Sequence, residues 1–102
     1  MIGIGVGGTV AAATPARMEQ ETVRLVGTHE IVSLVGTCSA DGSAHLHVAL
    51  ADAKGVVFGG HLVGDMHVFT TAEVVLADCE ALRWTRTMDD RTGFRELCVQ
   101  RR

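Results

Sequence analysis

The chain lacks a large cluster of basic residues, and this lack bears on whether it binds nucleic acid. Its 102 residues include 9 Lys and Arg against 12 Asp and Glu, a formal net charge of −3. The one basic cluster is at the end, at Arg95, Arg101 and Arg102. Phosphate contacts supply most of the affinity of a protein for DNA, and they need a basic patch. Direct DNA binding by this chain is therefore doubtful.

Paired cysteines and long apolar segments are also lacking. Cys38, Cys79 and Cys98 are widely spaced, and no two of them have the two-residue spacing of a zinc knuckle. This odd number of scattered thiols indicates a reduced, intracellular setting, so we expect a cytoplasmic protein. The apolar stretch 1–8 is broken by glycine and has no basic flank. We expect neither a signal peptide nor a membrane span there.

The composition that remains favours β-structure. Aromatic residues are 4% of the chain and hydrophobic residues 47%, so the core must consist mostly of Val, Leu, Ile and Ala. β-branched residues suit strands, and 12 glycines with one proline suit many tight turns. A chain of this length can bury one modest core. We therefore expect residues 1–102 to form a single domain.

Strand-like segments follow one another along the chain, and none shows a sustained helical period. They recur about every 8 to 12 residues, which favours an antiparallel sheet or an open barrel. The glycine-rich start lacks the preceding strand and following helix of a dinucleotide-binding loop. The expected strands are 9–14, 18–25, 31–34, two strands of a hairpin within 45–62, then 68–76, 83–88 and 94–99.

Three histidines lie on either side of one tight turn. His45 and His47 are two residues apart, so both imidazoles lie on the same face of a strand. Asp52-Ala53-Lys54-Gly55 is typical of a turn, with glycine at the position of positive φ. If the loop is residues 53–55, His47 lies opposite His61. A loop one residue shorter would move His61 to the other face, so the cluster depends on this turn.

These motifs and those that follow them resemble the PPC (plants and prokaryotes conserved) domain. That domain occurs alone in bacteria and archaea, where it is described as DNA-binding, and is joined to AT-hooks in plant nuclear proteins. The resemblance covers about residues 28–99 and is carried by Glu30–Thr37, His45–Leu62, Thr71–Leu76, Arg86, Asp89, Thr92–Phe94 and Glu96–Leu97. It implies an α+β fold, mostly antiparallel β with little helix, that assembles as a homotrimer. The family's additional N-terminal strand and helix, and the AT-hook, are absent from this sequence.

Three imidazoles on one face form a ligand set for a divalent transition metal, with one position left open. The alternative is a structural group, in which the histidines bond one another, the backbone and water. The resemblance favours a metal, with zinc as the first choice, because His45, His47 and His61 match the family's histidine motifs. Glu73, in an apolar segment, is either a further ligand, a base or imidazole partner, or an outward-facing edge residue.

A second polar group lies near the end of the chain. Asp89-Asp90-Arg91-Thr92-Gly93 suits a turn, because Asp can cap its own loop and Gly can take positive φ. We expect Arg86 to clamp the turn made by Asp89, Thr92 and Gly93 through a bidentate bond to a carboxylate, within the chain or across an interface. Binding of a substrate anion by Arg86 is the alternative.

Three functions compete for this chain. The first is a self-associating interaction module, because the strand edges of a small β-rich chain need covering. The second is a metal-binding or small-molecule-binding protein, enzymes included, that uses the three histidines with Glu73. The third is DNA binding, for which the AT-hook of the plant proteins is missing. We rank them in that order and leave catalytic activity open.

Overall fold

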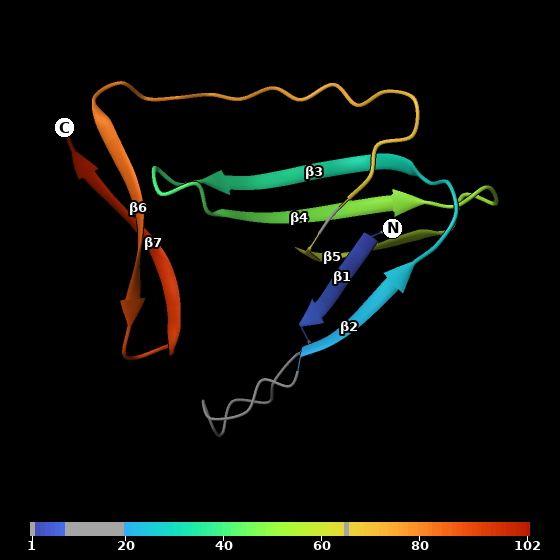
Figure 1. Ribbon diagram of the computed structural model, residues 1–102, viewed down its shortest axis with the longest axis horizontal. Coiled ribbons are helices and arrows are strands. Elements are labelled where there is room, and N and C mark those ends of the chain that lie inside the picture. The colour runs from blue at the N-terminus through green and yellow to red at the C-terminus, as the bar shows by residue number, and fades with distance from the viewer. Residues whose placement is uncertain (1, 8–19, 65) are drawn as a thin grey trace. The chain divides into compact units, whose positions relative to one another are not determined.

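The computed structural model describes residues 2–7, 20–64 and 66–102 (Figure 1). Its strands are β1 Ile2–Gly7, β2 Gln20–Leu25, β3 Glu30–Cys38, β4 Ala44–Ala51, β5 Val57–Val63, β6 Leu82–Asp89 and β7 Phe94–Arg101. These ranges contain no helix, so the expected α+β class is corrected to β for the described residues. The apolar residues there alternate with the period of strands, and none of the segments has the apolar period of a helix. The described ranges accordingly hold no helix able to cross a membrane.

The chain divides into two compact units. The first unit comprises Met1–Gly36 and His45–Ala72, and the second comprises Thr37–Ala44 and Glu73–Arg102. Whether the two together act as the single domain expected for 1–102 stays a prediction.

The larger sheet has five strands in the order β2-β1-β5-β4-β3. β1 pairs antiparallel with β2 and β5, and β5 pairs antiparallel with β4. Since β2 and β3 form its two edges, the sheet is open in the described part of the chain, as the sequence predicts.

The two faces of this sheet differ in chemistry. Val48 and Leu50 on β4 are buried, with 3% and 1% of their surfaces exposed. The partly buried residues packed against them are Leu25, Leu34, Leu62 and Met66. His45, His47 and Ala49 occupy the alternate positions of β4 and therefore face the other side. The core lies on one face and the histidines on the opposite one.

The second unit contains a two-stranded sheet, β6 paired with β7. The antiparallel register runs from Leu82 opposite Arg101 to Asp89 opposite Phe94. The strands expected at 83–88 and 94–99 are thus confirmed, and each is longer than expected.

Two sequence-based strand assignments fail. Residues 68–76 form no strand, and Val74, Val75 and Leu76 are 61%, 96% and 81% exposed. Local β propensity made this segment look like a strand, but a strand also needs a neighbour for its N–H and C=O groups. The glycine-rich start, for which the sequence predicts no strand, forms strand β1. The strand expected at 9–14 lies outside the described residues.

Candidate metal centre

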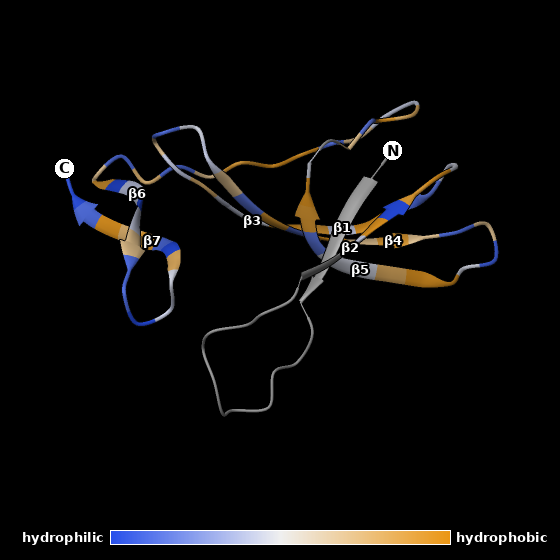
Figure 2. Ribbon diagram, turned by 60° about the horizontal axis from the view of Figure 1, so that its bottom comes forward, coloured by the Kyte–Doolittle hydropathy of each residue, from blue (hydrophilic) through white to orange (hydrophobic). Residues whose placement is uncertain are grey.

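The turn between β4 and β5 has the geometry that the histidine cluster requires. The Asp52 N–H donates to the Val56 carbonyl at 2.9 Å, and the Gly55 N–H donates to the Asp52 carbonyl at 3.0 Å. Asp52 Oδ1 accepts the N–H groups of Lys54 and Val56 at 2.8 and 2.9 Å, and Gly55 takes a φ of 79°. Figure 2 shows this turn as hydrophilic beside the hydrophobic Val57 end of β5. The predicted three-residue loop is confirmed.

The register that follows brings the three histidines together. His47 of β4 lies directly opposite His61 of β5. The ring centroids are 5.1 Å apart for His45 and His47, 4.7 Å for His45 and His61, and 5.3 Å for His47 and His61. One ring nitrogen from each residue lies within 4.8 Å of the other two. All three side chains reach solvent at least in part, so the group is open to a ligand.

Glycines lie on both strands that neighbour this group. A Cβ at Gly36 on β3 would collide with the carbonyl oxygen of His45, so β3 approaches β4 closely only with glycine there. On the other side, Gly5 of β1 is paired with His61. Gly3 and Gly7 share the face of Gly5 by strand alternation. No side chain from these three positions covers His61.

The donor set fits a divalent transition metal. In a tetrahedral zinc site with Zn–N bonds of about 2.0–2.1 Å, neighbouring nitrogens lie about 3.4 Å apart. The imidazole nitrogens here are within 4.8 Å of one another, so modest rotations of the rings would close the set. Neutral imidazole is a ligand common to zinc, copper, nickel and iron. His29 and His67 are not part of this group.

Glu73 belongs to a different unit from the three histidines. It is an exposed residue of the second unit, in the segment that forms no strand, and it does not belong to the metal-ligating group. Its role as a further ligand, base or imidazole partner stays a prediction.

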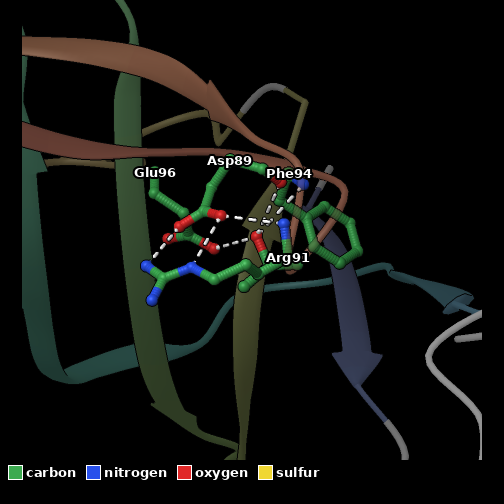
Figure 3. A network of polar contacts seen from close by, with 5 residues as sticks. Asp89, Arg91, Phe94 and Glu96 are labelled. Atoms are coloured by element: carbon green, nitrogen blue, oxygen red, sulfur yellow. Dashed lines mark hydrogen bonds and ion pairs between the residues drawn. The ribbon is translucent and has the colours of Figure 1, made fainter.

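Within the chain, Arg91 rather than Arg86 clamps the turn after β6 (Figure 3), whereas a bond from Arg86 across an interface stays a prediction. Arg91 donates from Nε to Asp89 Oδ1 at 3.2 Å and from Nη2 to Oδ2 at 2.9 Å, and its backbone N–H also bonds Oδ1 at 2.9 Å. These side-chain and backbone bonds lower the pKa of Asp89 below its ordinary value of 3.8. Gly93 has a φ of 75°, and Thr92 Oγ1 donates to Glu96 Oε1 at 3.1 Å.

Arg86 joins the β6–β7 hairpin to Thr37 near the end of β3. Its Nη2 donates to Thr37 Oγ1 at 2.8 Å and its Nη1 to the Arg95 carbonyl at 3.3 Å. Arg95 in turn donates to Asp41 Oδ2 at 3.2 Å. The bonds from Ser43, together with Arg95, lower the pKa of Asp41. Sequence reasoning missed the contribution of Arg91 and Arg95; the Asp41-Gly42-Ser43 turn was the available signal for the partner of Arg95.

Two curated relatives are both named Bifunctional protein GlmU and come from Synechococcus sp., strains JA-2-3B'a(2-13) and JA-3-3Ab. They are 42% identical over 92 residues and 40% identical over 95 residues. These matches cover 81% and 92% of this chain but only 14% and 15% of the relatives, so the chain spans about a seventh of their length.

A solved structure of similar fold is that of a hypothetical protein from Salmonella cholerae-suis. It is 33% identical with a TM-score of 0.81, and the match covers 99% of this chain and 65% of the other. The model of a known family, the Plants and Prokaryotes Conserved (PCC) domain, matches residues 1–80. The chain therefore belongs to the PCC domain family, the family that its motifs resemble.

Proposed function

We propose that the chain is a self-associating interaction module whose copies form a homotrimer. The observation that carries this proposal is the size of the core. Val48 and Leu50 are the buried hydrophobic residues of the described part of the chain. A domain of about 100 residues ordinarily buries far more, and extensive exposed apolar surface marks interaction sites. Large residues more than half exposed include Val26, Val32, Val35, Val68, Phe69, Val74, Val75, Leu76 and Met88.

Two further features support a module. The open sheet presents β2 and β3 as edges, and an edge strand can pair with another chain. The GlmU relatives contain a matching stretch as a small part of a much longer protein, which suits a domain that works joined to others. Direct DNA binding fits less well because a net charge of −3 offers few phosphate contacts.

Light scattering over a wide range of protein concentrations tests the assembly. We expect a mass about three times that of the 10.8 kDa chain. A monomer mass throughout would overturn the proposal.

The histidine geometry favours a second function, the binding of a divalent transition metal with zinc first. His45, His47 and His61 would hold the ion and leave a position for water or a small ligand. A bound ion of this kind supplies Lewis-acid chemistry. The chain's own contribution is to hold three imidazoles on a face opposite the core, where a ligand can approach them.

Calorimetric titration of chelator-treated protein with zinc chloride tests this second function. We expect one site, with binding abolished in His47→Ala and retained in His67→Ala, the matched control for an exposed histidine outside the group. The affinity should fall as the pH is lowered, since protonated imidazole does not bind metal. Equal affinity in wild type and His47→Ala would rule out the site.

A further inference from the structure

The second unit contains an extended segment that pairs with no strand, and a two-stranded sheet with an unpaired edge in the described part of the chain. Glu73–Cys79 runs extended between β5 and β6 in Figure 1 and is assigned to no strand. Val75, at its centre, is 96% exposed. The β6–β7 sheet has only two strands in the described part of the chain, and a two-stranded ribbon alone is marginally stable in water.

Backbone bonds identify the outer edge of β7 as the free one. The Trp84 carbonyl of β6 accepts the N–H of Ala40 at 2.8 Å, so it is directed away from β7. Residues directly opposite in an antiparallel pair either exchange both bonds or direct both groups outward. Because Trp84 is opposite Val99, the N–H and C=O of Val99 point to the outer edge of β7, as do those of Leu97 and Arg101 by alternation.

The segment cannot reach this edge within its own chain. It runs directly into β6 through a tight turn, in which the Leu82 N–H bonds the Cys79 carbonyl at 2.8 Å. A link of two residues joins strands that are neighbours. The outer edge of β7 lies beyond β6 and β7 themselves, each about 4.8 Å wide. If Glu73–Cys79 pairs with this edge, it does so on another copy of the chain.

The segment and the edge are complementary at the end of the segment that carries Glu73. The segment carries Glu73 and Asp78, and β7 carries Arg95, Glu96 and Arg101. The register proposed below places Asp78 opposite Glu96, so the favourable charge pair is the one that Glu73 makes. Val75 of the segment would extend the apolar strip of Val99, which is itself 46% exposed. Antiparallel pairing with these two valines opposite each other places Glu73 opposite Arg101, and cross-strand pairs of opposite charge are favourable.

We propose that Glu73–Cys79 of one copy adds as an antiparallel strand to the outer edge of β7 in a second copy, with Val75 opposite Val99. This inference rests on the proposed self-association and assigns it a contact. Each copy offers one segment and one edge, so the contact is head-to-tail. Such contacts close into a ring when the rotation between copies allows it.

Disulfide trapping tests the contact. Two tagged proteins, Val75→Cys and Val99→Cys, are made with Cys38, Cys79 and Cys98 replaced by serine, then mixed and oxidised. Opposite residues that exchange both backbone bonds have Cα atoms about 5.5 Å apart, which suits a disulfide. We expect a covalent heterodimer from the mixture and none from either protein alone. Val74→Cys, which points to the opposite face, is the matched control and should not cross-link to Val99→Cys.

A charge swap avoids cysteine altogether. Glu73→Arg and Arg101→Glu should each weaken association, and the double variant should restore it. Failure to cross-link, with the oligomer mass intact, would overturn this contact and leave self-association standing. A monomer mass would overturn both. A variant that carries both Val75→Cys and Val99→Cys gives a further check. A disulfide formed only within single chains of this variant would overturn the contact between copies.

Discussion

His45 holds its position because the residue beside it on β3 has no side chain. A Cβ at Gly36 would collide with the carbonyl oxygen and the backbone of the neighbouring strand. We expect Gly36→Ala to lower the free energy of unfolding by about 1–3 kcal/mol, the usual cost of overpacking. Urea unfolding measures this. Val35→Ala, at the adjacent 68% exposed position, should change stability little, and an equal loss in both variants would contradict the steric explanation.

Asp89 gives the second unit a dependence on pH. Its bonds from Arg91 lower its pKa below 3.8, so it favours the folded state when ionised. A carboxyl of this kind stabilises the fold above its unfolded pKa, and the contribution is lost as the pH falls through the folded pKa. The midpoint temperature of thermal unfolding should therefore be nearly constant between about pH 7 and 5 and should decline below about pH 4.

Asp41, whose pKa is also lowered, contributes to the same decline. Asp89→Asn should make the decline shallower, whereas the neighbouring Asp90→Asn should leave it unchanged. A profile that is the same for wild type and Asp89→Asn would exclude Asp89 as a source.

Among the elements, the β4–β5 hairpin depends on a turn that only a few residues define. Gly55 has a φ of 79°, where an L side chain is strained. We expect Gly55→Ala to cost about 1–2 kcal/mol of unfolding free energy, the penalty of a left-handed conformation for a residue with a Cβ. Denaturant unfolding measures the loss, and Lys54→Ala in the same loop is the control. No loss in Gly55→Ala would show that another turn serves equally well.

This hairpin also shows which parts of the fold a sequence can predict. Its register follows from one local turn, so the meeting of His47 with His61 could be deduced from residues 52–55 alone. Strand β1 could not be predicted in this way, because glycine disfavours strands. Residues 2–7 form a strand only through pairing with β2 and β5. For residues 68–76 the error is the reverse: their β propensity predicts a strand, but they pair with no strand in the described part of the chain.

The polar group around Asp89 was foreseen only in part. An aspartate and a glycine in the right places predict the turn, and Gly93 does take positive φ. Which arginine reaches the carboxylate depends on the path of the loop, and that path brings Arg91 rather than Arg86 into the bidentate position shown in Figure 3. Loop side-chain contacts of this kind are not encoded by spacing.

For the whole molecule, the proposed association would link folding to the burial of exposed apolar side chains. Val48 and Leu50 are buried hydrophobic residues, whereas many valines among the residues whose burial the structure describes are exposed. Burial of the exposed valines against other copies would supply the missing apolar contact. Any partner that binds only the folded state raises its apparent stability through mass action.

The thermal midpoint should therefore rise with protein concentration. Over a range of about 2 to 200 μM we expect a steady increase, because each copy that associates removes folded chain from the unfolding equilibrium. Differential scanning calorimetry or circular dichroism at matched scan rates measures it. Val75→Ser should flatten the increase, whereas Lys54→Ser, at an exposed polar position in the other unit, should not. A midpoint that stays constant for the wild type would mean that each copy folds on its own core, and the self-associating module would be wrong.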